Sequence, residues 1–430
     1  MHRDGRGLEL SGADGPLAAS IGRFQEDFQG FRSAAAGIFD LADEHPACIA
    51  AQLWAASLAV YSQVTTDIEA QAGPRLARAG ALLDGATERE RILHRAVSAW
   101  AGKRYGEAAD AFEALLARWP EDVNAVKLAE FVFFEAPDYP RHLRLMDSVA
   151  AANADLPAFG AMHAFANELN RRYDDAESIG RDALERDPDT PWAQHALAHL
   201  YLNTVRLAEG TRLLTEASPS WDGHTPGIRS HNAWHLALLH LADLDVEAVW
   251  TTHRRWCDQK EPSSAFEHTD AISLLWRLEL SDLEVPDSAW SAFLPWAAER
   301  ADDDVTPFLG AHYLYALTRA GERAAARESL ARLEARSVPG TPAWRSGLPL
   351  LRGVVDLAAG DVRGCVASVG PVLGSLACIG GSDAQNDLFA QSYLVALARS
   401  GRVDEATRML RGRAGDRPFT AQEESWLRTS

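Results

Sequence analysis

A repeated spacing constrains the fold of this chain more than any other feature of its sequence. The segment YGEAADAFEALLARWPED begins at Tyr105 and the segment YDDAESIGRDALERDPDT begins at Tyr173, with Tyr, Ala and Pro at equivalent places. These three pairs have the same separation, since 173 − 105, 176 − 108 and 188 − 120 all equal 68. Tyr139 lies midway between the two segments, and Leu207 continues the series, since 139 − 105, 173 − 139 and 207 − 173 all equal 34. Four consecutive units therefore keep one period.

A period of about 34 residues is typical of tetratricopeptide units, each of which is a pair of helices joined by a turn. The small Ala of each repeat allows the two helices to approach closely, and the Pro near its end stops the second helix. Each unit then buries its remaining apolar face on the next unit. The sequence therefore predicts an all-α fold, a curved α-solenoid of tetratricopeptide-like helix-turn-helix repeats.

The predicted solenoid takes up almost the whole chain of 430 residues. Residues 1–16 form a polar, Gly-rich N-terminal segment, and we expect residues 17–430 to form a single tetratricopeptide-like solenoid. Its clearest repeats span 100–220, and degenerate repeats span 230–412. Three regularly spaced glycines are expected in tight turns between the degenerate helices: Gly321, Gly360 and Gly401.

The charge and motif content exclude several classes of function. Lys and Arg number 42 against 61 Asp and Glu, and the resulting net charge of -19 repels nucleic acid and anionic membranes. No apolar run is long enough to span a membrane, and the four cysteines lack the close spacing of zinc or redox motifs. No phosphate-binding glycine loop indicates a nucleotide cofactor, and the opening residues lack an apolar signal region. We expect a cytoplasmic protein without nucleic-acid or membrane partners.

The centre of the chain carries an unusual set of histidines. Two predicted helices, in PWAQHALAHLYLN and HNAWHLALLHLADLD, each hold two histidines at i and i+4, so each pair lies on one helix face. The pairs are His195 with His199 and His231 with His235. Together with Trp192 and Trp234, the four imidazoles converge if the two helices are neighbours.

Three interpretations of these histidines remain open. A divalent metal such as zinc would take His195, His199 and one of His231 and His235, with Asp270 as a carboxylate ligand and one position left for water. The glutamate of an H-E-x-x-H motif is absent, however. Without a metal, His and Asp act as general acid and base, and Asp270 or Asp387 holds an imidazole in one tautomer. In the third interpretation the histidines only pack.

Two further polar segments have structural alternatives. GGSDAQND is a loop followed by a helix start, with Ser382 or Asp383 as the N-cap; it is either a cap and turn or a loop folded over a pocket. Asp270 and Arg277 lie two turns apart on one helix face, which favours a polar contact as the role of Arg277.

The combination of WAxHAxAH, HNxWHxAL and GGSxAQxDxF resembles the tetratricopeptide repeat protein 38-like family, because generic repeats contain none of these motifs. The resemblance runs over nearly the whole chain, and it implies a bent all-helical solenoid. At matching positions the signature residues are Trp192, His195, His199, His231, Asn232, Trp234, His235, Asp270, His312, Gln385 and Asp387. The chain departs from the family pattern at HAFANEL, where Glu168 is a further acidic candidate.

The predicted function is recognition of a small polar molecule in a His/Trp/Asp-rich pocket of the concave groove, and its conversion by acid-base or metal-assisted chemistry stays open. The candidate catalytic residues are His195, His199, His231, His235 and Asp270. The candidate ligand-binding residues are Trp192, Asn232, Trp234, His312, Gln385, Asp387 and Glu168. The alternative is a non-catalytic scaffold that binds a peptide or helix in the groove. Oligomeric state and enzymatic activity stay undecided.

Overall fold

The computed structural model describes residues 2–258, 264–336 and 341–428. Within these ranges the chain is an all-α helical repeat solenoid with a single two-stranded ribbon, which confirms the predicted fold class. It divides into two compact units, Met1–Leu200 with Leu213–Asn232, and Tyr201–Arg212 with Ala233–Ser430. The predicted single solenoid over 17–430 stays a prediction.

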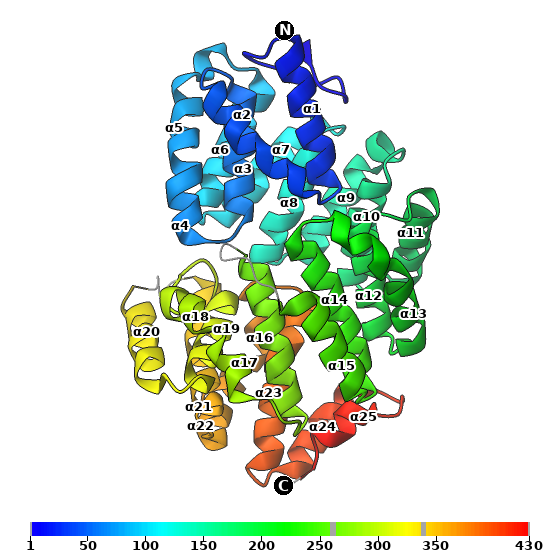
Figure 1. The fold of residues 1–430 in the computed structure, drawn as a ribbon, viewed down its shortest axis with the longest axis vertical. Coiled ribbons are helices and arrows are strands. Elements are labelled where there is room, and N and C mark those ends of the chain that lie inside the picture. Colours follow the sequence, from blue (N-terminus) through cyan, green and yellow to red (C-terminus); the bar gives the residue numbers. More distant parts are fainter. Residues whose placement is uncertain (1, 259–263, 337–340, 429–430) are drawn as a thin grey trace. The chain divides into compact units, whose positions relative to one another are not determined.

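The first unit holds the clearest repeats (Figure 1). Its helices are α1 (Gly15–Gln29), α2 (Ile38–Glu44), α3 (Ile49–Tyr61), α4 (Thr65–Asp67), α5 (Gly73–Ala81), α6 (Glu88–Ala101), α7 (Tyr105–Leu116), α8 (Val123–Glu135), α9 (Tyr139–Asn153), α10 (Pro157–Leu169) and α11 (Tyr173–Arg186). Short 3-10 or π segments are η1 (Ser33–Gly37), η2 (Ile68–Ala72), η3 (Leu83–Gly85) and η4 (Ser218–Gly223). Three helices have residues in both units: α12 (Pro191–Asn203), α13 (Leu207–Ala217) and α14 (Pro226–Ala242).

The predicted period is confirmed by where the helices begin. The second helix of each repeat starts at the predicted residue: Tyr105, Tyr139, Tyr173 and Leu207. The first helices α8, α10 and α12 begin with the same spacing, since 157 − 123 and 191 − 157 both equal 34. The repeat alanines Ala108 and Ala176 are buried, as close helix packing requires.

The turns inside these units share a left-handed residue. Lys103, Arg171 and Val205 have φ of 57°, 59° and 56°, and they occupy the same place in the repeat, since 171 − 103 = 68 and 205 − 171 = 34. In the repeat formed by α8 and α9 the equivalent residue is Pro137, whose ring excludes a positive φ. That unit therefore joins its helices with a different turn.

The N-terminal segment folds against the first repeat. β1 (His2–Arg3) pairs antiparallel with β2 (Glu9–Leu10), and Leu8 and Leu10 are buried. Ser11 donates from Oγ to a carboxylate oxygen of Glu90 at 2.5 Å, and Glu90 itself closes a capping box at the start of α6. This hydrogen bond attaches the segment to α6, and the two buried leucines give the otherwise polar segment an apolar contact.

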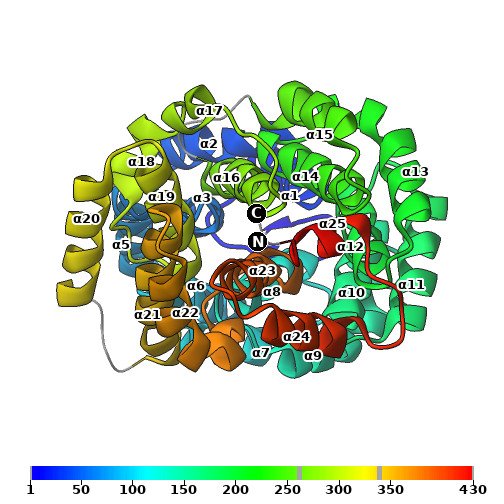
Figure 2. The same ribbon diagram turned by 90° about the horizontal axis from the view of Figure 1, so that it is seen from below.

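The second unit contains the later, degenerate repeats. Its remaining helices are α15 (Val246–Thr252), α16 (Ala265–Leu280), α17 (Asp287–Ser291), α18 (Leu294–Arg300), α19 (Pro307–Arg319), α20 (Arg323–Arg336), α21 (Pro342–Ala358), α22 (Val362–Val369), α23 (Asp383–Arg399), α24 (Val403–Ala414) and α25 (Ala421–Ser425), with η5 (His253–Cys257) and η6 (Gly370–Cys378). Helix α21 packs against both α19 and α22 (Figure 2). Within the predicted span 230–412, residues 259–263 and 337–340 lie outside the described residues.

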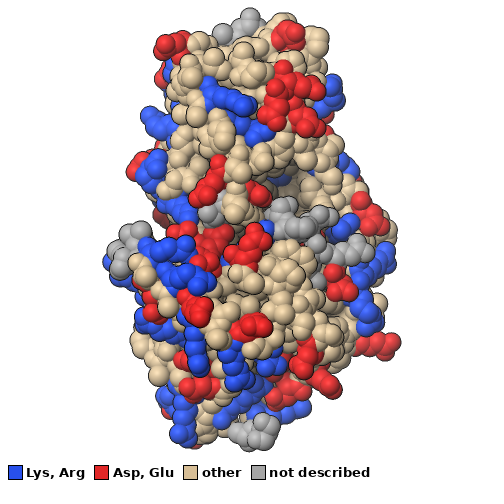
Figure 3. All heavy atoms as spheres, turned by 60° about the vertical axis from the view of Figure 1, so that its left-hand side comes forward, with Lys and Arg blue, Asp and Glu red and all other residues tan. Residues whose placement is uncertain are grey.

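The glycine turns of this unit are confirmed. Gly321, Gly360 and Gly401 have φ of 95°, 90° and 89°, a conformation that side-chain-bearing residues rarely adopt. No helix among the described residues is long and apolar enough to cross a bilayer. On the face drawn in Figure 3, basic side chains lie among acidic ones.

Candidate functional site

Helix α14 and the segment before it are hydrogen-bonded to the first turn of α12. Each helix begins with a proline, whose fixed φ suits the first helical turn and whose missing N–H costs nothing there. Asn232 donates from Nδ2 to the carbonyl of Pro191 at 3.0 Å. The indole of Trp221 donates to Oε1 of Gln194 at 2.9 Å. Asn232, a predicted ligand-binding residue, thus fixes the position of one histidine helix on the other.

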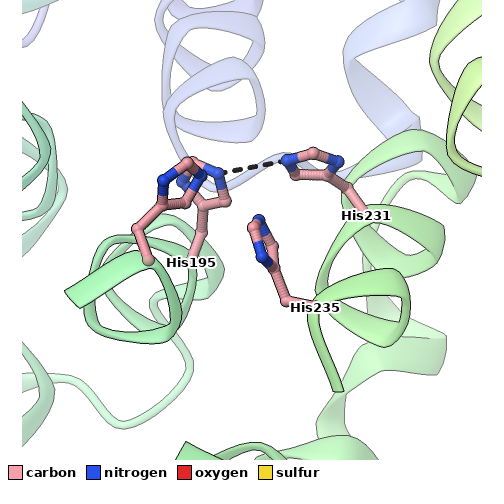
Figure 4. A group of neighbouring side chains, drawn as sticks. His195, His231 and His235 are labelled. Atoms are coloured by element: carbon pink, nitrogen blue, oxygen red, sulfur yellow. Dashed lines mark hydrogen bonds between the residues drawn. The ribbon is translucent and has the colours of Figure 1, made fainter. Parts of the chain in front are cut away.

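This arrangement brings a histidine of α12 against a histidine of α14, as the sequence predicts for neighbouring helices. Nε2 of His195 lies 3.1 Å from Nε2 of His231, and both residues are buried (Figure 4). One Nε2 must carry a proton and donate while the other accepts. Burial lowers the pKa of His195 well below its usual range, and the nearby His199 and His231 lower it further. His195 is therefore neutral, so one of its two ring nitrogens carries a proton and the other keeps a lone pair.

A third histidine and a carboxylate complete this cluster in the first unit. Nδ1 of His199 lies 3.6 Å from Oε2 of Glu168 on α10, and both side chains are fully buried. Phe165 packs against both rings, with its centroid 4.7 Å from that of His195 and 5.1 Å from that of His199. One ring nitrogen from each of His195, His199 and His231 lies within 4.8 Å of the others. We call these three residues with Glu168 the histidine cluster.

His235 lies one turn after His231 on α14 and is fully buried. Figure 4 shows its ring on the same side of this helix as that of His231. Its ring centroid is 4.7 Å from that of Trp234. The face of α14 therefore offers two imidazoles, as the i, i+4 spacing predicts.

Trp192 joins the histidine cluster to a second buried polar group. Its ring stacks on His195 with centroids 4.2 Å apart, and its Nε1 donates to Oε1 of Glu130 on α8 at 3.1 Å. Burial raises the pKa of Glu130 to about 8, although Trp192 and Lys127 both lower it. Oε2 of Glu130 is buried with no hydrogen-bond partner among the described residues. A protonated Glu130 would carry its proton on that oxygen.

Lys127 lies one turn before Glu130 on α8 and is also buried. Its Nζ donates to the carbonyl of Phe28 near the end of α1 and lies 3.3 Å from the ring centroid of Phe31. Burial lowers the pKa of Lys127 well below its usual range, and Glu130 opposes this effect. Because carbonyls at a helix C-terminus and aromatic faces both attract cations, these contacts also favour the ammonium form.

A cavity of about 260 Å³ adjoins these residues within the first unit. Phe31 and Trp192, stacked with centroids 5.3 Å apart, both line it, together with Lys127. Arg32 also lines the cavity and is paired with Asp189 at 2.8 Å. Trp192 is therefore shared, because it lines the cavity and its ring stacks on His195.

The long loop before α14 holds one wall of this cavity. His224 contacts the carbonyl of Gly30 through Nδ1 at 3.1 Å and Oδ1 of Asp189 through Nε2 at 2.8 Å. The backbone N–H of Thr225 donates to the carbonyl of Phe31 at 2.6 Å. The Pro/Gly-rich insertion thus positions residues that line the cavity.

Other predicted site residues belong to the second unit. The indole of Trp234 donates to Oγ of Ser273 at 2.8 Å, and the guanidinium of Arg277 lies 5.3 Å from its ring centroid. Arg277 donates to the carbonyl of Ala384 at 2.8 Å, which confirms the polar contact expected for it. Burial lowers the pKa of Arg277 to about 10, while Asp387 and the buried Asp270 on α16 raise it.

The residues of GGSDAQND have structural contacts. Ser382 is the N-cap of α23, and Gln385 closes a capping box with it, so the cap-and-turn interpretation describes this segment. Asp387 accepts hydrogen bonds from Gln391 and Arg413. His312 contacts the carbonyl of Phe308 through Nδ1 at 2.8 Å, and burial lowers the pKa of His312 to about 3.

Sequence reasoning missed Phe31, Lys127, Glu130 and His224. A usable signal existed for two of them, because Lys127 and Glu130 interrupt the otherwise apolar stretch AVKLAEFVFF at a spacing of one turn. Buried charges of this kind are rare unless a partner compensates them. Phe31 and His224 stand outside the repeats and have no comparable signal.

No family model matches the chain. Among solved structures, the chain is similar to the TPR domain of P58(IPK), with 12% identity over 79% of this chain and 96% of that chain and a TM-score of 0.22. It is also similar to a human IFIT1 dimer with PPP-AAAA, with 13% identity over 83% of this chain and 89% of that chain and a TM-score of 0.33. Likenesses this distant say nothing about the site or its ligand.

Proposed function

We propose that this chain is a cytoplasmic member of the tetratricopeptide repeat protein 38-like family that binds a small polar molecule in the cavity of its first unit. The observation that carries the proposal is the position of Trp192, which lines the cavity and stacks on His195. A volume of about 260 Å³ is slightly smaller than cavities that hold drug-sized ligands, so the ligand is the size of a metabolite.

The charges around the cavity favour a neutral or cationic ligand with an apolar part. Phe31 and Trp192 provide aromatic surface, which binds apolar groups and cations. Glu26, Asp187 and Asp189 line the cavity against the basic residues Arg32 and Lys127. Asp189 neutralises Arg32, and Lys127 is directed to a backbone carbonyl, so the exposed carboxylates of Glu26 and Asp187 dominate the field at the opening.

The neighbouring histidine cluster provides the chemistry of the proposal. The neutral imidazole of His195 is hydrogen-bonded to His231, so one of the two rings gives a proton in this contact and the other takes it. Glu168 beside His199 stabilises an imidazolium when the cluster accepts a proton. Glu168 and the three histidines are not among the residues that line the cavity, so acid-base conversion by these groups requires metal-free protein and a bound molecule that reaches past Trp192.

The experiment fills the cavity without removing any polar group. Ala158 lines the cavity, and Ala158→Phe adds a ring to that space; Ala151→Phe adds the same ring at an exposed position on α9 outside it. The probes are panels of polyols, amino alcohols and quaternary ammonium compounds, tested by native mass spectrometry and thermal shift. We expect parent and Ala151→Phe to bind the same probe and Ala158→Phe to lose it at least tenfold.

Two results decide against the proposal. Equal binding by Ala158→Phe and the parent places the ligand elsewhere. Binding of extended peptides, but of no small probe, by all three proteins supports the alternative, a non-catalytic scaffold for a peptide or helix.

A further inference from the structure

The histidine cluster has a geometry that proton sharing between two residues does not require. A single N–H···N hydrogen bond explains why His195 and His231 are 3.1 Å apart, and nothing more. It does not explain why a ring nitrogen of His199 also lies within 4.8 Å of both, in a region closed by Phe165 and Trp192. Three imidazole nitrogens that converge on one point are the arrangement that coordination of a single ion requires.

We infer that His195, His199 and His231 form a binding site for one divalent transition-metal ion of the zinc class. Histidine nitrogens bind zinc at about 2.0–2.1 Å. Two nitrogens bound to the same ion are therefore about 3.3 Å apart when the angle at the metal is tetrahedral, and about 2.9 Å apart when it is a right angle. The observed 3.1 Å between His195 Nε2 and His231 Nε2 falls between these values. The two nitrogens are thus already as close as two ligands of one ion.

The surroundings of His199 match those of a metal-bound histidine. Such a histidine usually directs its second ring nitrogen to a carboxylate, which orients the ring and increases its basicity. Glu168 Oε2 lies 3.6 Å from His199 Nδ1, just beyond hydrogen-bond distance, so a small shift of either side chain makes this bond and Nε2 of His199 is the ligand atom. Glu168 is therefore a positioning residue, and its negative charge offsets part of the ion's charge in a site without solvent.

Metal binding replaces the hydrogen bond between His195 and His231. The shared N–H···N contact is lost, two nitrogen–metal bonds form, and the imidazole that held the proton on Nε2 becomes the Nδ1–H tautomer, so the rings stay neutral. Three histidines fill three of the four tetrahedral positions that zinc prefers. His235, one turn further along α14, is the second imidazole on the same helix face as His231.

This inference goes beyond the proposed ligand site, because it is tested with metal alone. Protein stripped with a chelator is dialysed against Zn²⁺ or Co²⁺, and bound metal is measured by elemental analysis and by the visible absorption of Co²⁺. We expect about one equivalent in the parent and at least a hundredfold weaker binding in His195→Gln and His199→Gln. Glu168→Gln should weaken binding about 10–100-fold, as measured for residues that orient metal ligands.

The matched control is His142→Gln, which removes another buried histidine of the first unit, on α9 outside the cluster. It should bind metal like the parent. Added Zn²⁺ should raise the melting temperature of the parent and of His142→Gln, and leave that of His195→Gln unchanged, because only a site in the folded state couples binding to stability. The parent measurement stands even where a variant fails to fold.

A parent that binds neither ion, or equal loss of metal in His142→Gln and His195→Gln, overturns the inference. The ligand proposal fails separately, because it depends on how Ala158→Phe binds the small probes in metal-free protein.

Discussion

Replacing Glu130 with glutamine should change how the stability of this protein depends on pH. Burial raises the pKa of Glu130 to about 8, against an ordinary value of 4.5. Between these two values the unfolded chain releases the proton and the folded chain keeps it, so the free energy of unfolding falls as the pH rises. The stability that a protonated Glu130 allows is complete below about pH 4.5 and is lost by about pH 8. The shift of about 3.5 units corresponds to about 5 kcal/mol.

Glu130→Gln removes this loss without removing the hydrogen bond from Trp192. The amide oxygen accepts from the indole Nε1 as the protonated carboxyl does, and the amide does not titrate. Relative to the parent, the variant should therefore gain about 5 kcal/mol of unfolding free energy between about pH 4.5 and pH 8.5. Urea unfolding at both pH values measures this double difference, in which the titration of all other groups cancels.

The control is Glu185→Gln, an exposed carboxyl of the same unit, which should change the double difference by less than about 0.5 kcal/mol. A double difference below about 1 kcal/mol for Glu130→Gln would refute the reasoning. It would mean that Glu130 stays ionised in the folded protein, paired with a charged Lys127 one turn away. Lys127→Met would then destabilise the parent strongly, because it would leave a buried anion unpaired.

Four smaller predictions follow from local contacts. Lys103→Gly should stabilise the protein by about 1 kcal/mol, because glycine adopts the left-handed φ of 57° without strain. Gly360→Ala should destabilise it by about 1–2 kcal/mol, because alanine is strained at a φ of 90°. Thermal melts of both variants check these two signs. Asn232→Ala should cost about 1–3 kcal/mol in urea unfolding, since the carbonyl of Pro191 loses its buried donor. Burial lowers the pKa of His142 to about 3, so the stability that it provides is present above about pH 6.5 and lost as the pH falls toward 3. His142→Gln should therefore unfold at a lower pH than the parent in an acid titration followed by circular dichroism.

The repeat architecture followed from sequence because packing itself is periodic. Helix starts at Tyr105, Tyr139 and Tyr173 reflect one set of contacts repeated along the chain, so a single spacing was sufficient to place them. The meeting of His195 with His231 was predicted on the condition that their helices are neighbours. Helices α12 and α14 meet this condition although α13 lies between them in sequence, because each repeat packs on the next.

The cavity did not follow from sequence, because much of its wall comes from outside the repeats. Phe31 lies beyond the end of α1, and the loop that contains His224 holds it in place through the backbone of Thr225. Such contacts join distant parts of the chain and leave no periodic trace; the separation of His224 from Gly30 is 194 residues. The period likewise does not predict the different turn at Pro137, because it assumes the same turn in every repeat.

One part of the site can be recovered once the period is used as a register. Helices α8, α10 and α12 begin at equal intervals, so Lys127, Ala161 and His195 occupy the same position in successive repeats, since 161 − 127 and 195 − 161 both equal 34. By the same count Ala158 is equivalent to Trp192.

Equivalent positions of a solenoid lie on one face, so a residue that departs from the small, apolar consensus at one position directs attention to the same position in its neighbours. His195 was recognised by its i, i+4 partner, and counting back two repeats from it leads to Lys127 on the cavity wall. The two buried polar groups thus occupy the same position of the repeat, and the small, buried Ala161 occupies it in the repeat between them.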